Sequence, residues 1–215
     1  MSCPRSATLL AALASLTLGA CYPYRAAGNL GPYPYGPPAP SPGGTSPWEA
    51  SPLDTRPVTA DDPVEVQWKE RMAQPYVFLE HNGDYRLMGA TMRQLMQAAA
   101  GLPVTGPPFA LFYDDPGSTP LSELRARVCL PVATEPQTMP SDFRYEVLPR
   151  SMVVYARVSG PYDHAGRIYG QLFAYMQKLN WKRGGPIRET YLVNPGEVAD
   201  PARLWAEVQI PCQVN

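Results

Sequence analysis

Charged residues are scarce in this sequence, and several common signals of function are missing. Lys and Arg number 18 and Asp and Glu number 19 in 215 residues, so 17% of the chain is charged and the net charge is −1. Because no basic stretch stands out, nucleic-acid binding is not expected. The only two histidines, His81 and His164, are too far apart in the chain for a metal cluster. The sequence has no phosphate-binding loop, Ser nucleophile motif or helix-turn-helix segment, and no cofactor is expected.

The N-terminal apolar run is too short to cross a membrane. It covers residues 7–18, follows Arg5, and at about a dozen residues fits a leader peptide. The letters LGAC, which end at Cys21, come directly after it and resemble the lipobox of bacterial lipoproteins. The resemblance implies cleavage before Cys21 and acylation of that residue, with palmitate-type chains holding the protein on a membrane. Tyr22 follows instead of Asp, which favours the outer membrane facing the periplasm; an ordinary secretory signal is the alternative.

Proline divides the chain before any other motif does. Eleven of the 27 prolines fall in residues 22–63. A segment rich in Pro, Gly and Tyr with few branched apolar residues cannot bury enough surface to fold. The sequence therefore predicts a signal peptide at 1–20, a lipid-anchored disordered linker at 21–63 and a folded domain at 64–215. The linker is a spacer or, alternatively, a ligand for a protein partner or the cell wall that the sequence does not identify.

The folded domain contains an internal repeat. At a shift of 77 residues, 76–100 lies over 153–177; at 79, Gly106-Pro107 lies over Gly185-Pro186; at 80, LRARVCLP lies over LWAEVQIP. The small drift in the shift is what loop insertions would produce. The two repeats cover about 64–132 and 143–212. Identical pairs are Gly83/Gly160, Tyr85/Tyr162, Gly89/Gly166, Gln94/Gln171 and Leu95/Leu172.

Each repeat predicts the same series of elements. A lead strand (64–68 or 143–148) and a second strand (76–81 or 152–158) precede a Gly-X-Tyr turn and an amphipathic helix. Two further strands follow, and the last one ends at Pro131 or Pro211. The fold class is therefore α+β, with two pseudo-symmetric β-α-β-β type repeats that form a curved antiparallel sheet and two helices on one face.

These phrases resemble a known family. YVFLEHNGDYRLMG, GPPFALFYDDP and RVCLP in the first repeat, with VVYARVSGPYDHAG, GGPIRETYLVNP and AEVQIP in the second, are similar to the GyrI-like domain, which is distantly related to the SOUL family. This is also the effector-binding domain of multidrug-responsive transcription activators. The resemblance covers 64–215 and implies a cleft that binds small, apolar or cationic organic molecules. Some members are hydrolases of strained ring compounds.

The last strands present two different faces, because alternate residues of a strand point in opposite directions. One face is apolar and is expected under the helices: Ala126, Val128 and Leu130, with Ala206, Val208 and Ile210. The other is a mixture that suits a ligand cleft: Arg125, Arg127 and Cys129, with Trp205, Glu207 and Gln209.

Two carboxylates are candidate ligand-binding residues. Glu207 lies where the family often has an acidic residue, and beside aromatic rings it would suit an organic cation. Its alternative is a structural ion pair with Arg125 or Arg127. Glu189 fits the family's Glu two residues before a Tyr, and its counterpart in the first repeat is Ala110. Core packing is the alternative for most of the aromatic candidates. The remaining candidates are Phe78, Phe112, Tyr113, Tyr155, Tyr191, Trp205 and Arg127.

The sequence thus predicts a lipid-anchored cell-envelope protein that binds a small organic molecule between two repeats. Direct transcriptional control is not expected, because a lipobox and a linker stand where the regulators carry a DNA-binding module. One alternative is a hydrolase that uses Glu207 or Glu189 as general base, although no second catalytic group can be placed. Another is an envelope scaffold whose cleft is vestigial. An envelope location would permit a disulfide between Cys129 and Cys212, but the spacing leaves this open.

Overall fold

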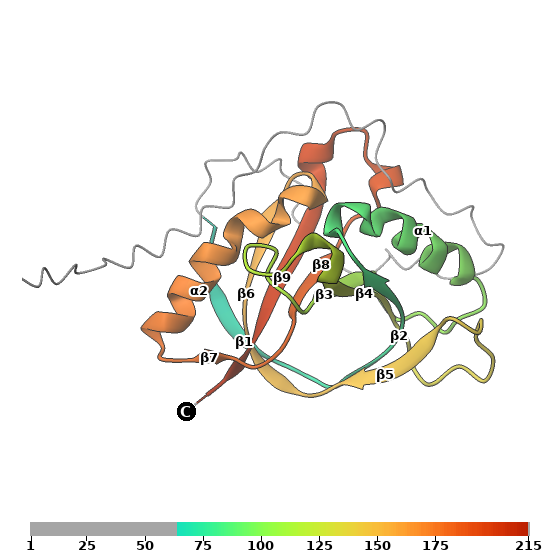
Figure 1. Ribbon diagram of the computed structural model, residues 1–215, viewed down its shortest axis with the longest axis horizontal. Coiled ribbons are helices and arrows are strands. Elements are labelled where there is room, and N and C mark those ends of the chain that lie inside the picture. Colours follow the sequence, from blue (N-terminus) through green and yellow to red (C-terminus); the bar gives the residue numbers. More distant parts are fainter. Residues whose placement is uncertain (1–63, 215) are drawn as a thin grey trace, which may run out of the picture.

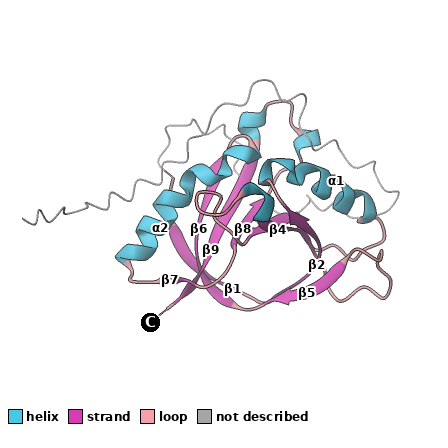
Figure 2. Cartoon of the chain, viewed as in Figure 1, coloured by secondary structure: helices cyan, strands magenta, loops and turns pink. Residues whose placement is uncertain are grey.

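The computed structural model describes residues 64–214. The leader and the linker predicted for residues 1–63, with Cys21, lie outside the described residues. The described chain is an α+β fold in which two helices cover one face of a curled antiparallel sheet (Figures 1 and 2). The fold class predicted from the sequence is confirmed.

The order of elements repeats along the chain. The first repeat contributes β1 (Gln67–Arg71), β2 (Gln74–Asn82), α1 (Met88–Ala98), β3 (Phe109–Phe112) and β4 (Arg125–Pro131). The second contributes β5 (Arg144–Leu148), β6 (Ser151–Ser159), α2 (Tyr169–Lys178), β7 (Lys182–Arg183), β8 (Ile187–Tyr191) and β9 (Trp205–Gln213). Short 3-10 helices are η1 (Tyr85–Leu87), η2 (Leu121–Glu123), η3 (Tyr162–Ile168), η4 (Pro195–Glu197) and η5 (Pro201–Arg203).

The strands pair in the order β1-β6-β9-β8-β3-β4-β2-β5, and β7 adds a short pairing with β9. All of these pairings are antiparallel. The pseudo-twofold axis passes between β3 and β8, where Ala110 pairs with Glu189. Ala110 and Glu189 are equivalent residues of the two repeats, 79 positions apart in the sequence, so each lies opposite its own counterpart.

The two lead strands are exchanged between the repeats. β1 belongs to the first repeat in sequence but pairs with β6, and β5 belongs to the second but pairs with β2 (Figure 1). In β1, Lys69 lies opposite Val153; in β5, Glu146 lies opposite Tyr76. The sequence predicted a strand at each position, and the first prediction, 64–68, begins three residues before β1. It did not predict the exchange. Each half of the sheet is therefore completed by chain from the other half.

The apolar faces of the sheet and helices form the main core, as alternation predicted. The buried residues of α1 that face the sheet are Met88, Met92 and Leu95, and those of α2 are Leu172 and Met176. They pack against the predicted apolar face of the last strands, Ala126, Val128, Leu130, Ala206, Val208 and Ile210. A second, smaller cluster lies on the opposite face and contains Tyr76, Phe78, Phe109, Leu111, Cys129 and Leu148.

A pair of equivalent glycines ends β2 and β6. Gly83 has φ +108° and Gly160 has φ +107°, a region that residues with a Cβ rarely adopt. Their N–H groups donate to the carbonyls of Leu124 (2.7 Å) and Leu204 (2.8 Å). The Gly-X-Tyr turn thus connects each second strand to the last strand of its own repeat, and it sets where each helical segment begins.

Candidate functional site

The structure divides the predicted site residues between the two faces of the sheet. Tyr191 and Phe112 belong to the core under the helices, as does Glu189, which shares the orientation of Tyr191 on β8. The others lie on the face without helices, where Phe78 and Tyr113 join the smaller cluster and Lys69 covers the ring of Tyr155. Arg127, Glu207 and Trp205 share this face by alternation along β4 and β9. These residues are thus not brought together into one cleft.

Glu207 is neutralised by side chains of its own chain. Its carboxylate accepts bonds from Lys69 Nζ (2.5 Å), Arg157 Nε (2.9 Å) and Gln209 Nε2 (2.7 Å). Burial pushes its pKa upward, but the bond and charge of Lys69, with the bonds from Gln209 and Arg157, outweigh burial and hold the pKa below its usual value. Lys69 Nζ also lies 4.1 Å from the ring centre of Tyr155. The contacts expected for an organic cation are made by this lysine.

Glu207 forms structural ion pairs, as the alternative to ligand binding had it, but not with Arg125 or Arg127. Arg125 bonds Asp114 instead, with Nη2 2.9 Å from its carboxylate. Arg127 lies 2.6 Å from Glu146 and 3.6 Å from Glu80, and its guanidinium carbon is 4.1 Å from the ring centre of Phe78. The physical reason for Arg127 and Glu207 is the strand exchange, which places Glu146 of β5 beside the first and Lys69 of β1 beside the second.

Glu189 has a different environment on the helix side of the sheet. It is 5% exposed, and Tyr169 at the start of α2 donates a hydrogen bond of 2.5 Å to its Oε1. The Tyr191 hydroxyl is 3.5 Å from Oε2. Within residues 64–214, no Lys, Arg or His forms an ion pair with this carboxyl. Burial raises the pKa of Glu189 to about 7, with Tyr169 and Tyr191 opposing the rise.

Glu189 has aromatic side chains on its own side of the pseudo-twofold axis and a small side chain on the other side. The Tyr191 ring packs against Tyr162, with centroids 4.7 Å apart. Across the axis, the residue opposite Glu189 is Ala110, which is fully buried. A single buried carboxyl with tyrosine rings nearby combines charge with π faces, the two features that recognise organic cations.

Tyr162 and its equivalent Tyr85 hold their loops in the same way. The Tyr85 hydroxyl donates to the carbonyl of Asp114 (3.1 Å), and the N–H of Asp114 lies 3.3 Å from the hydroxyl oxygen. The Tyr162 hydroxyl exchanges the same two bonds with the backbone of Val193. The recurrence of these tyrosines in both repeats therefore reflects a shared structural role.

Sequence reasoning missed two residues of functional interest, Tyr169 beside Glu189 and Arg188 on the opposite face of the sheet. Tyr169 lies three residues before Leu172 and seven before Met176, so helical spacing places it on the buried face, where a core role hides its contact with Glu189. Arg188 was passed over although a basic residue next to a glutamate inside a buried strand is a signal. It is 6% exposed, and its guanidinium stacks on Phe109.

The structure also bears on the cysteines, on metal ligands and on helices that could cross a membrane. Cys129 and Cys212 are both buried and unbonded, so they form no disulfide. Within residues 64–214 no group of three His, Cys, Asp or Glu side chains is placed to hold a metal ion. In the same part of the chain, the helices are too short or too polar to cross a membrane.

Comparisons with known proteins agree with the fold. The structure resembles the EcmrR C-terminal domain with a TM-score of 0.59 at 20% identity, covering 71% of this chain and 99% of that one. The same TM-score and identity are found for EcmrR in its DNA complex with RPo, of which the match spans only 58%. A Listeria innocua hydrolase encoded by lin2189 gives 0.52 at 11% identity, covering 69% of this chain and 92% of the other. No curated protein matches the sequence.

A family model assigns the chain to a protein family, which the structural similarities alone do not do. The model of the GyrI-like small molecule binding domain matches residues 64–213, which is nearly all of the described chain. It spans both repeats, the exchanged lead strands and the strand that carries Glu189. The chain therefore belongs to the GyrI-like family of small-molecule-binding domains.

Proposed function

We propose that this protein binds small organic cations at Glu189, in the layer between the sheet and the helices, and that a lipid on Cys21 holds it at the cell envelope. The observation that carries the binding proposal is a buried carboxyl with no counter-charge among residues 64–214. A buried charge without a partner is costly, and a bound cation would remove that cost. Glu207, the other candidate, already has two cationic partners.

The ligand class follows from the surroundings of this carboxyl. The groups closest to it are tyrosine side chains and apolar core residues. Such a site favours a cation whose charge is spread over alkyl or aryl groups, since a compact ammonium ion loses more hydration on entry. Hydrophobic quaternary ammonium compounds fit this description.

A thermal-shift titration tests the proposal on the full chain at pH 8, where Glu189 is ionised. We expect benzyltrimethylammonium to raise the unfolding midpoint, and its neutral carbon isostere neopentylbenzene to raise it much less. Glu189→Gln should remove the difference between the two compounds. Glu207→Gln is the matched control and should keep it. Equal stabilisation of the wild type and Glu189→Gln by the cation would contradict the proposal.

A hydrolase remains a second candidate for one reason. A carboxyl with a pKa of about 7 and a tyrosine hydroxyl at 2.5 Å has the properties of a general base at neutral pH. An enzyme would turn over an ester probe in the wild type and lose turnover in Glu189→Gln. A binding protein would show the cation-dependent stabilisation without turnover.

A further inference from the structure

The face of the sheet without helices carries an excess of positive charge in its second half. Lys69, Arg71, Arg157 and Arg188 all lie on this face, with Glu207 as their carboxylate neighbour. Glu207 bonds Lys69 and Arg157. Its carboxylate is thus taken up by these two cations. Arg71 and Arg188 form no ion pair within residues 64–214, although both are at least partly buried.

Arg188 is the more enclosed of the two. Its Nε donates to Thr190 Oγ1 (3.0 Å), and its Nη1 donates to Gln74 Oε1 (2.6 Å). The guanidinium carbon lies 3.9 Å from the ring centre of Phe109. Burial lowers the pKa of Arg188 to about 10, so it stays charged at neutral pH. A buried cation with only neutral partners calls for an anion.

Two further polar atoms on this face have no partner in the part of the chain that is described. They are Arg71 Nε, a donor, and Gln209 Oε1, an acceptor, and both are buried. Gln209 lies directly opposite Arg188 on the neighbouring strand. Arg71 is fixed by bonds from its Nη2 to the Pro149 carbonyl (3.0 Å) and Ser151 Oγ (3.1 Å). Its charge is close enough to contribute to the lowered pKa of Arg188.

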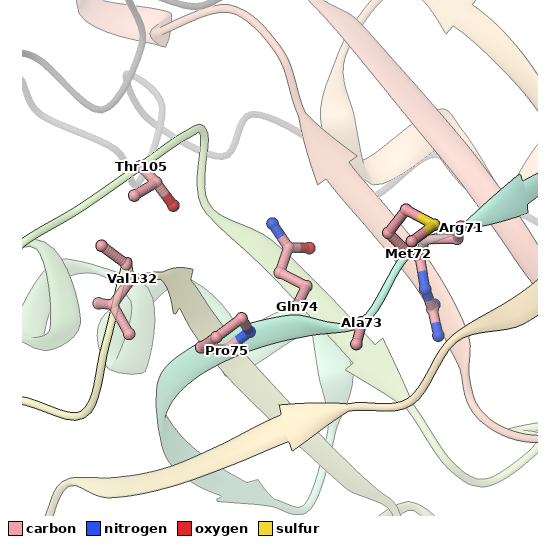
Figure 3. A pocket seen from close by; sticks show the side chains of 8 residues that line it. Arg71, Met72, Ala73, Gln74, Pro75, Thr105 and Val132 are labelled. Atoms are coloured by element: carbon pink, nitrogen blue, oxygen red, sulfur yellow. The ribbon is translucent and has the colours of Figure 1, made fainter.

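A groove of about 400 Å³ borders this region at the turn between β1 and β2. Arg71 and Gln74 both line it, together with Thr105 on the far side (Figure 3). The Gln74 side chain reaches the groove and also accepts the bond from Arg188. Arg71 would contact an anion in the groove directly, and Gln74 is the lining residue that connects the groove to Arg188.

We propose that Arg71, Arg188 and Gln209 form a site for a small oxyanion that carries a hydroxyl group, such as an α-hydroxycarboxylate or hydrogen phosphate. The two guanidinium groups donate to the anionic oxygens, and Gln209 Oε1 accepts from the hydroxyl. Guanidinium forks suit planar carboxylates and phosphates because they donate two parallel hydrogen bonds. This site lies on the opposite face of the sheet from Glu189 and is independent of the cation proposal.

The test is a titration of the full chain with lactate, phosphate and acetate, with sodium chloride adjusted to constant ionic strength. Isothermal calorimetry on the wild type should give saturable binding for lactate or phosphate, and acetate, which lacks the hydroxyl, should bind more weakly. The response to lactate against phosphate separates the two oxyanion sources. A wild type that shows no binding of either beyond that of chloride would overturn the proposal.

Variants locate the site. Arg188→Met should weaken binding at least tenfold, and Arg188→Lys should weaken it less because it keeps the charge without the fork. Arg150→Met, which changes an exposed arginine paired with Glu70, is the matched control and should bind as the wild type does. Retained affinity in Arg188→Met would also overturn the proposal. Stabilisation of this variant by benzyltrimethylammonium should persist, which keeps the two sites distinguishable.

Discussion

Arg127 and Glu207 occupy equivalent positions in the two repeats, and each is held by residues of the opposite charge. Arg127 lies 2.6 Å from Glu146 on β5, and Glu207 lies 2.5 Å from Lys69 on β1. The second partners are also equivalent, since Glu80 on β2 corresponds to Arg157 on β6 at the shift of 77. The two clusters have the same geometry with the charges inverted.

This inversion bears on the strand exchange. If β1 paired with β2, in its own repeat, Lys69 would lie beside Arg127. If β5 paired with β6, Glu146 would lie beside Glu207. Like charges at neighbouring positions destabilise a sheet, so the charges favour the exchanged pairing over the unexchanged one.

Charge reversal on the exchanged strands should therefore destabilise the protein. Lys69→Glu places a second carboxylate beside that of Glu207 in place of its closest cation, and we expect a loss of roughly 2 kcal/mol in the free energy of unfolding. Glu146→Lys should act in the same direction. Urea denaturation measures both, and reversing the exposed Glu70–Arg150 pair as a double variant is the control, with little change expected.

Combining Lys69→Glu with Glu146→Lys distinguishes the two topologies. If the double variant keeps the exchanged sheet, each new charge faces its own kind and the two losses should add. In the unexchanged sheet each new charge would face an opposite charge, so recovery of stability is the result expected if these charges select the pairing. Simple addition of the two losses would contradict a dominant role of the charges.

The pKa of Glu189 predicts a pH dependence of stability. The carboxyl has an ordinary pKa of 4.5 in the unfolded chain and about 7 in the folded one, so the folded state binds more protons between these values. Stability should fall as the pH rises from about 4.5 to about 7 and then level off, with a total loss of up to about 3 kcal/mol. Glu189→Gln should lack this decrease. A parallel pH profile for both proteins, measured by urea denaturation, would show that Glu189 titrates normally.

Removal of the Tyr169 hydroxyl should shift this titration. Its hydrogen bond lowers the pKa of Glu189, so Tyr169→Phe should raise that pKa and extend the loss of stability to higher pH. Binding of benzyltrimethylammonium should weaken at pH 7 and recover at pH 9, where the carboxyl is ionised again. Tyr175→Phe, a half-buried tyrosine of the same helix, is the control. A pH profile unchanged by Tyr169→Phe would argue against this hydrogen bond.

Lipid attachment has a separate test. Cys21→Ser should prevent acylation and release the protein from the membrane fraction, since several acyl chains supply the anchoring free energy. Mass spectrometry of the mature protein should show the loss of the lipid mass. Cys3→Ser, within the predicted leader, is the control. Membrane fractionation and mass that do not change in Cys21→Ser would exclude the lipobox interpretation.

The sequence was sufficient for the parts of the fold that depend on local periodicity. The alternation in β4 and β9 placed residues such as Val128 and Val208 on the correct side, because the period of a strand fixes the direction of its side chains. The shift of 79 also paired Glu189 with Ala110, which the structure puts at the pseudo-twofold axis.

The parts that failed depend on contacts between distant segments. Lys69 and Glu207 are 138 positions apart, so no local pattern could assign them as partners. The exchange of β1 and β5 has the same origin, since either pairing satisfies the alternation of each strand. The prediction that Glu207 and Glu189 line one cleft was wrong. The alternation of side chains was considered for β9 but not for β8, where it points Glu189 to the opposite face.

The exchanged lead strands also have a consequence during protein synthesis. Gln67 on β1 pairs with Tyr155 on β6, so β1 has no partner until 88 more residues have been made. At translation rates of about 5 to 20 residues per second this is a delay of roughly 4 to 18 seconds, during which β2 is the strand nearest in the chain. A nascent chain that stops before β6 leaves β1 unpaired, although β5 has by then covered the edge of β2. The first half of the sheet can therefore close once β5 has been made, whereas the second half waits for β9 at the end of the domain.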